Sequence, residues 1–475
     1  MIKSDIELTI TQDTLKEFMF TLQEAQGEND LDELGSFKKE IYLKALEGQV
    51  EELTKQVEDY ENLKNGVIEP FKVSEIMKLP NYIIRKRIAS GRSLEELSEY
   101  TGIDVRQLEE YEEELFVEAP PSDLAKIIKT LQIPVPTPFF SMLQVKLIDL
   151  KKNIAKSLKN LETFILPEEI KQGENQSLGY LKLFSRLKGI YDEYAEKFLL
   201  DSSQPIQFSS VSSFKYKVPK GVSQELVYSY TTFATYLAKV VSTSYTVEAA
   251  SFLTDYRMFK EQVLRGYGIL NLESCVNYMW DLGIPVIPLK AKGGFHGACW
   301  RSNGKNVIIL KQQANSEARW LFDLLHEYWH ATQEPELEER SVVDFTETLS
   351  QIEQDSEEIA ANNFASDVLF NGKRNELIEA CYEEAQFKLA YLKNAVINIS
   401  NANYVDTGSL ANFVAYDVQT KVKSKNQTWW GAAQTLQNKN NPHGVVLKVL
   451  EERLDFNNIE DKLDREMVIN LIEAE

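Results

Sequence analysis

Cysteine and histidine are scarce in this chain of 475 residues, which holds three of the first and four of the second. Cys275, Cys299 and Cys381 lie far apart and form no C-x-x-C pair. This pattern argues for a reducing compartment and against a zinc site built from cysteines. The three cysteines therefore predict no metal site of their own.

Long apolar runs are also missing. The longest, "GIPVIPL" (283–289) and "NVIIL" (306–310), fall far short of the roughly 20 residues that a membrane span needs, and the beginning "MIKSDIELTITQD" has no signal-peptide hydrophobic region. We therefore expect a cytoplasmic protein with no membrane association. At 43% hydrophobic and 26% charged residues, the chain can bury several cores, so two to four domains are expected.

Positive charge is in deficit, because 52 Lys and Arg stand against 73 Asp and Glu and give a formal net charge of −21. Such a surface repels a phosphate backbone unless basic residues gather on one face. Nucleic-acid binding therefore needs a local argument.

The first segment with a clear periodicity runs from Leu43 to Tyr60, where apolar residues follow a 3-4-3-4-3 spacing. This spacing predicts a helix with an apolar seam, within the helical segment 1–80. Two uses stay open, packing within the same domain and a short coiled coil that forms a homodimer. Gly48 lies inside the seam and weakens both slightly.

Residues 83–133 then predict short helices joined by tight turns. Ser93 with Glu96 forms a capping-box pattern, and "TGID" (101–104) supplies a glycine turn before the next helix. "RKRIASGRSLEELSEYTGI" followed by "DVRQLEEYEEEL" resembles the Xre/Cro-type helix-turn-helix family. That resemblance makes the second stretch the recognition helix, with Arg106 and Gln107 as candidate base contacts.

The candidate recognition helix is unusually acidic for DNA binding. Between residues 104 and 114, six acidic residues stand against Arg106 alone, and residues 81–135 hold eleven acids and seven bases. A helix in the major groove needs cationic or amide side chains toward phosphates and base edges. DNA binding is therefore disfavoured relative to dimerisation or recognition of a protein partner.

The chain changes character after this module. The prolines of "PVPTPFF" (134–140) predict a linker, and 141–270 predicts a mostly helical linker or sensor region with a serine-rich loop at 201–214. "GIPVIPL" and "GACWRSNGKNVIIL" predict strands and a hairpin at "NGK" (303–305). A helix is expected directly after them, over 315–333.

That helix carries two of the four histidines in the motif H-E-x-x-H, His326-Glu327-Tyr328-Trp329-His330. Positions i and i+4 share one helix face, so both imidazoles reach one ion, while Glu327 is displaced toward the attacking water. Random order gives this motif on the order of a few times per thousand such chains, so the match is informative. The alternative is an amphipathic helix whose histidines cap or hydrogen-bond.

Two histidines do not complete a catalytic zinc site, which needs three protein ligands. His296 and His443 are in no ligand-like pattern, so we searched downstream for a carboxylate. "SEEIAANNFASDVLF" (356–370) offers Glu358, with Asn362 four residues on and able to support a metal-bound histidine. Glu357 is the adjacent alternative to Glu358.

H-E-x-x-H followed by E-x-x-A-N-x-F-A resembles the ImmA/IrrE-type zinc metallopeptidases over roughly residues 280–372. The resemblance implies Zn²⁺ held by His326, His330 and Glu358, with Glu327 as the general base. It also implies a selective endopeptidase whose substrate is a helix-turn-helix repressor or an antitoxin-like protein, in stress response, mobile-element control or phage defence. Fusion to an Xre-type module is a known arrangement of that family.

Two rival functions remain, a regulator or sensor that uses the peptidase fold without cutting, and a toxin-antitoxin component. His296 is a further candidate for a residue that contacts substrate. Trp429 and Trp430 are expected in the core, with the wall of a substrate groove as the alternative, and His443 is expected in a surface loop, with oxyanion stabilisation as the alternative. The expected fold class is α+β and predominantly helical. The expected segments are the N-terminal helices 1–80, the helix-turn-helix 81–135, the linker or sensor 141–270, the zinc metallopeptidase 271–372 and the helical C-terminal region 373–475.

Overall fold

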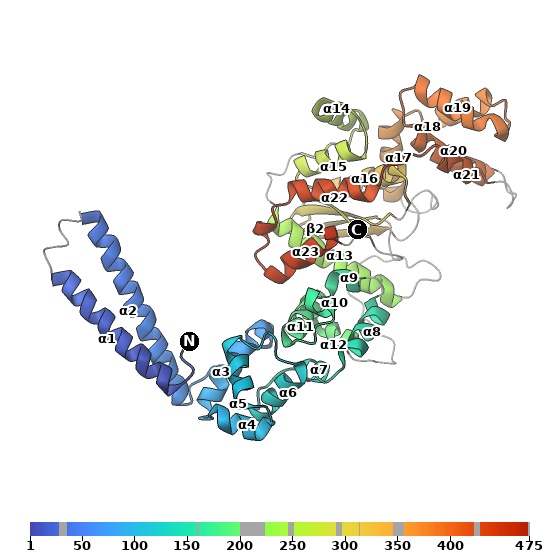
Figure 1. Ribbon diagram of the computed structural model, residues 1–475. Helices are drawn as coiled ribbons and strands as arrows, with labels where there is room; N and C mark the ends of the chain where they lie inside the picture. The colour runs from blue at the N-terminus through green and yellow to red at the C-terminus, as the bar shows by residue number, and fades with distance from the viewer. Residues whose placement is uncertain are drawn as a thin grey trace. The chain divides into compact units, whose positions relative to one another are not determined.

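A computed structural model of the protein describes residues 1–27, 36–158, 161–199, 224–245, 251–290, 297–312, 314–344, 356–421 and 428–473. The chain divides into two compact units. Unit 1 holds Met1–Asn153, Leu166–Gly189 and Glu193–Leu200, and unit 2 holds Ile154–Ile165, Ile190–Asp192 and Asp201–Glu475. Helices predominate and one four-stranded mixed sheet is present, so the fold is of the α+β kind (Figure 1). Among the described residues, no helix is both long and apolar enough to cross a membrane.

Unit 1 begins with two helices, α1 (Asp5–Gly27) and α2 (Ser36–Lys64), which pack side by side (Figure 1). Leu46, Val57 and Tyr60 of the apolar seam are buried. Tyr60 and Lys64 donate to the carboxylate of Asp5 at 3.1 and 2.8 Å, which ties the two helices at one end. In the structure, the apolar seam of α2 therefore packs against α1 of the same chain.

The next helices of unit 1 are short. They are η2 (Val73–Lys78), α3 (Leu79–Ala89), α4 (Leu94–Thr101), α5 (Val105–Glu113) and α6 (Pro121–Thr130). The expected capping box is present at the start of α4, because the Ser93 hydroxyl accepts from the Glu96 amide and the Glu96 carboxylate accepts from the Ser93 amide, both at 3.2 Å. Gly102, with a φ of 70°, ends α4 in the left-handed conformation that glycine favours. The expected pair of short helices joined by a tight turn is therefore confirmed.

One of the acids on α5 belongs to the core. Glu112 is 3% exposed and forms a two-pronged ion pair with Arg87 of α3, at 2.6 and 2.8 Å. Glu109, Glu110 and Glu113 are exposed on the same helix, as is Arg106, and Glu114 is exposed directly after its end. The surface of α5 is therefore acidic.

The proline cluster is not a linker throughout, contrary to our prediction. Helix α7 (Thr137–Met142) begins inside it, with Pro138 in its first turn. Proline is tolerated there because the first amides of a helix have no acceptor within the helix. The helices that follow are α8 (Leu147–Leu158), α9 (Glu162–Ile165), α10 (Glu168–Gln172), α11 (Ser177–Tyr191), η3 (Asp192–Tyr194) and α12 (Ala195–Leu199). The predicted serine-rich loop 201–214 lies outside the described residues.

Unit 2 contains the sheet, with strands β1 (Val286–Pro288), β2 (Gly297–Ser302), β3 (Lys305–Leu310) and β4 (Arg340–Asp344) in the order β1-β3-β2-β4. β1 is parallel to β3, and β2 is antiparallel to both β3 and β4. Asn303 and Gly304 have φ values of 49° and 74°, so the expected hairpin turn is present. β2 and β3 are buried almost throughout, which shows that both faces of the sheet are covered.

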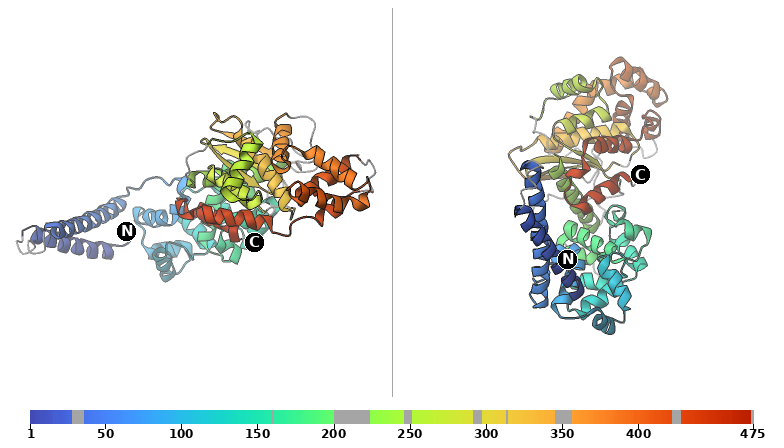
Figure 2. Two further views of the ribbon diagram at one scale, coloured as in Figure 1. Left: turned by 90° about the horizontal axis from the view of Figure 1, so that it is seen from above. Right: turned by 60° about the vertical axis from the view of Figure 1, so that its left-hand side comes forward.

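Helices that precede the strands in the sequence and helices that follow them both cover the sheet. α13 (Gln224–Ser244) and α16 (Glu317–Thr332) both pack on β2 and β3, and α22 (Pro442–Arg453) packs on β1 and on α15 (Leu272–Asp281). Unit 2 also contains α9 and the helices α14 (Tyr256–Tyr267), α17 (Ser356–Phe370), α18 (Arg374–Glu384), α19 (Leu389–Ala402), α20 (Thr407–Lys421), α21 (Trp430–Gln434), η4 (Phe456–Asn458) and α23 (Lys462–Glu473). α22 lies beside the sheet in the views of Figures 1 and 2, so the C-terminal region completes the core around α16.

Candidate metal centre

Helix α16 holds the histidine pair, and most of its residues are buried. The Ser316 hydroxyl accepts from the Arg319 amide and caps the helix, and no glycine or proline interrupts it before Thr332. Its apolar residues face the sheet on one side and α17 on another. His326 and His330 are fully buried as a result, so their rings are fixed by packing.

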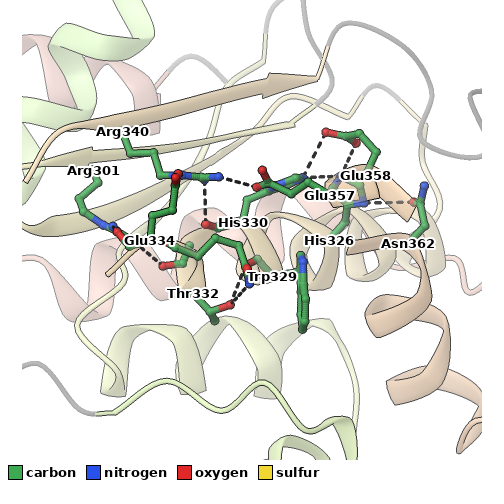
Figure 3. A network of polar contacts seen from close by, with 12 residues as sticks. Arg301, His326, Trp329, His330, Thr332, Glu334, Arg340, Glu357, Glu358 and Asn362 are labelled. Atoms are coloured by element: carbon green, nitrogen blue, oxygen red, sulfur yellow. Dashed lines mark hydrogen bonds and ion pairs between the residues drawn. The ribbon is translucent and has the colours of Figure 1, made fainter. Parts of the chain in front are cut away.

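Three side chains converge at one point between α16 and α17. The Nε2 atoms of His326 and His330 lie 3.1 Å apart. The Glu358 carboxylate places Oε2 at 3.3 Å from His326 Nε2 and Oε1 at 3.4 Å from His330 Nε2. One ligand atom from each residue lies within 4.8 Å of the other two. Figure 3 shows the three side chains pointing toward one another.

The donor set fits a tetrahedral metal ion. Zinc binds imidazole nitrogen and carboxylate oxygen at about 2.0–2.2 Å, which separates neighbouring ligand atoms by about 3.3 Å in a tetrahedron. The observed separations of 3.1–3.4 Å match that edge. Two imidazoles and one carboxylate are also a ligand set that leaves the fourth position open.

The second nitrogen of each ring is held by a residue of α17. His326 Nδ1 lies 3.1 Å from Asn362 Oδ1, and His330 Nδ1 lies 2.8 Å from Glu357 Oε1 (Figure 3). Both partners are acceptors, so each Nδ1 can donate a hydrogen bond to its partner while each Nε2 is directed toward the shared point. The arrangement therefore directs one nitrogen of each imidazole to the place where a metal ion would bind.

Glu357 is in turn fixed by Arg340 of β4. One guanidinium nitrogen donates to Glu357 Oε1 at 2.5 Å, a second donates to the carbonyl oxygen of His330 at 3.0 Å, and Nε pairs with Glu334 at 2.9 Å. The hydrogen bond from His330, followed by that from Arg340, lowers the pKa of Glu357 to about 2. Glu357 is therefore ionised, and it connects His330 of α16 with Arg340 of β4, a strand at the edge of the sheet.

Arg301 of β2 performs a similar task at the end of α16. It is 3% exposed and donates to the carbonyl oxygens of Ala331 at 2.8 Å and Gln333 at 3.0 Å, and to Glu334 in the same turn. Asn306 of β3 accepts from Arg301 at 2.9 Å. The last carbonyl groups of a helix have no N–H donor within the helix. At the end of α16, side chains of the sheet supply donors to these carbonyl groups.

Glu327 lies against the first residue of β2. Its side chain is 1% exposed, and a Cβ at Gly297 would overlap Glu327 Oε1. Burial raises the pKa of the neighbouring Cys299 thiol to about 12, and the charge of Glu327 adds to that shift. Because Gly297 has no side chain, the Glu327 carboxylate can occupy the space beside it.

The other residues singled out from the sequence have separate places. His296 lies outside the described residues. Arg106 and Gln107 belong to α5 in unit 1, where Gln107 donates to Glu110 at 2.9 Å. Trp429 is 5% exposed and His443 lies on α22, with its ring centre 6.0 Å from that of Trp320.

Sequence reasoning missed Gly297, Arg301 and Arg340. A signal for the two arginines was present, because each lies in a strand rich in uncharged residues where a charge needs a specific partner. For Gly297 we find no such signal, because a glycine at the start of the predicted strand "GACW" does not indicate which distant side chain packs against it.

Comparison with known proteins identifies one family. Residues 279–380 match the model of Peptidase_M78, described as the IrrE N-terminal-like domain, so this part of the chain is similar to a peptidase family. The matched range contains the histidine pair, Glu327, Glu358 and all four strands. Neither a curated protein nor a solved structure matches the chain.

Proposed function

We propose that the protein is a zinc-dependent endopeptidase that cleaves a specific regulatory protein. The observation that carries the proposal is the convergence of His326, His330 and Glu358 with tetrahedral spacing. Glu327, which follows His326 on α16, is also buried. The match of this segment to a peptidase family supports the same reaction class. Zinc would be held by those three residues.

When bound there, the ion polarises the scissile carbonyl and lowers the pKa of water toward about 7. Glu327 accepts a proton from the attacking water and delivers it to the leaving amine, because it follows His326 on the helix and is displaced from the ligand face. Asn362 and Glu357 contact the Nδ1 atoms of the two rings and so orient both Nε2 atoms toward the ion. Because both histidine side chains are buried, packing limits each imidazole ring to one orientation.

For the substrate, we propose a helix-turn-helix repressor or an antitoxin-like protein. The support is the resemblance of residues 280–372 to the ImmA/IrrE-type peptidases together with the short helices of unit 1. For those helices we propose a protein partner rather than DNA. The exposed acids of α5 around Arg106 would repel phosphates, which supports that choice.

The proposal is tested by expressing the wild type and Glu327→Gln in cells and comparing the proteomes. Glutamine keeps the shape of the side chain but accepts no proton, so fragments that need the glutamate should disappear while the metal content stays the same. Fragments that persist in Glu327→Gln contradict the assigned base.

His326→Ala provides the second arm of this test, because it removes a ligand. We expect elemental analysis of the purified variant to show loss of zinc, whereas Glu327→Gln retains it. If neither wild type nor variant yields fragments while the wild type binds zinc, the rival reading of a non-cutting sensor is favoured.

A further inference from the structure

Unit 1 contains an open groove that the peptidase reaction does not use. It has a volume of about 1050 Å³ and is lined by α6, by α7 with the connections before and after it, and by the beginning of α8. These three helices are labelled in Figure 1. Its floor is apolar, since Ile128, Ile133 and Leu143 are 2%, 5% and 2% exposed. Ile148, 75% exposed, forms part of an apolar rim.

The charges around the groove have one sign. Its lining residues include Lys126, Lys129 and Lys146 but no aspartate or glutamate, in a chain with 73 acids and 52 bases. Lys126 forms an ion pair with Asp123 at 2.8 Å. For the ammonium groups of Lys129 and Lys146, both exposed, the described part of the chain offers no hydrogen-bond acceptor or ion-pair partner. Two lysines are therefore available to an anionic group bound in the groove.

The apolar floor and the cationic edges of the groove together favour one class of ligand over others. A nucleic acid would place its phosphates at the lysines but would leave the floor uncovered, and a flat bilayer does not enter a concave groove. A helix with leucine-like side chains on one face and carboxylates along its borders satisfies both parts at once. Charge complementarity with the lysines would also fix its direction.

We propose that this groove is a docking site for an acidic amphipathic helix of a partner protein. The apolar face of the helix covers Ile128, Ile133 and Ile148, and its carboxylates pair with Lys129 and Lys146. The proposal does not depend on the peptidase activity, because every residue it uses lies in unit 1.

The test measures binding of a fluorescein-labelled amphipathic peptide of leucine, alanine and glutamate, about 18 residues long so that it forms a helix. The full-length protein is used in fluorescence anisotropy. We expect saturable binding that weakens about tenfold or more in the double variant Lys129→Glu/Lys146→Glu, because two attractive contacts become repulsive. The same peptide with lysine in place of glutamate should not bind.

Lys55→Glu/Lys72→Glu is the matched control, since it changes the net charge equally at two exposed lysines of unit 1 outside the groove. It should leave the affinity nearly unchanged. Ile148→Ser, at an exposed position that folding does not need, should weaken binding through the apolar face.

Three results would overturn the proposal. One is equal loss of affinity in the control pair, which would reduce the effect to net charge. Another is binding of oleate at the groove without binding of the peptide, which would indicate a fatty-acid site. The third is concentration-dependent self-association abolished by Lys129→Glu/Lys146→Glu, which would make the occupant a second copy of the chain.

Discussion

The direction of each imidazole ring decides what the histidine pair can do. A hydrogen-bond acceptor at each Nδ1 leaves both Nε2 atoms, 3.1 Å apart, as ligands toward one point. Without Asn362 and Glu357 the rings would be free to carry the proton on either nitrogen. The roles of the two neighbouring glutamates therefore differ, with Glu358 at the Nε2 atoms and Glu357 at an Nδ1.

This difference predicts an order of zinc affinities. Glu358→Gln removes a ligand and should lower the affinity by several orders of magnitude, whereas Glu357→Gln keeps an acceptor for His330 and should lower it about tenfold. Competition with a chelator measures both. Glu376→Gln, at an exposed site on α18, serves as control and should bind zinc as the wild type does. The reverse order of the first two variants would make Glu357 the ligand.

Gly297 offers a way to disturb the base without touching the metal ligands. The methyl group of Gly297→Ala would overlap Glu327 Oε1 and push the carboxylate out of its place. We expect proteolysis to fall by about a hundredfold or more, since small misplacements of catalytic groups are costly. Zinc content and melting temperature should change little, because the end of the glutamate side chain can move.

The matched control for that variant is Gly304→Ala, in the turn between β2 and β3, where no atom lies within 4 Å of the added carbon. Its positive φ of 74° makes it strained, so it should lower stability and leave the rate of the folded protein intact. A Gly297→Ala enzyme with wild-type activity would show that the position of Glu327 is not critical.

At the scale of elements, α16 depends on the strands beside it for its last turn. The Arg301 side chain is buried and donates to carbonyl oxygens at the C-terminal end of the helix. Arg301→Met leaves those acceptors without donors in a buried place, so we expect the free energy of unfolding to fall by about 3 kcal/mol. Urea denaturation measures the change, and Arg257→Met on the exposed face of α14 should stay within about 0.5 kcal/mol of the wild type.

Arg301→Lys separates charge from geometry at the same position. Lysine keeps the charge but cannot direct several donors to different carbonyl groups, so it should recover only a part of the lost stability. A variant as stable as the wild type would show that the charge alone suffices.

Elements with a local period could be predicted from the sequence, while contacts between distant elements could not. The spacing of His326 and His330 predicted one face of one helix, and "NGK" predicted the hairpin that the structure contains. Gly297 against Glu327, and Arg340 against Glu357, join different elements without any periodic pattern. Pro138 shows the opposite error, since proline content alone indicated a linker where a helix begins.

At the scale of the whole molecule, the division into two units predicts which part of the chain a metal ion at the candidate site would stabilise. All three candidate ligands belong to unit 2, and the helices α3 to α6 belong to unit 1. An ion that binds only the folded form stabilises the unit that holds it, by about 4 kcal/mol at a thousandfold excess over its dissociation constant. Removing the metal should therefore act on one unit alone.

We expect hydrogen exchange, followed by mass spectrometry, to become faster in α16 and α17 after treatment with a chelator, and to stay unchanged in α3 to α6. His326→Ala is the control, because a chelator has no ion to remove from it and should leave its exchange unaltered. Because the carbonyl groups at the end of α16 are held by Arg301 and Arg340 from the sheet, the C-terminal turn should lose less protection than the turn that contains His326. Equal acceleration in both units would mean that the two unfold as one, so that the ligands stabilise the entire chain rather than the unit around the sheet.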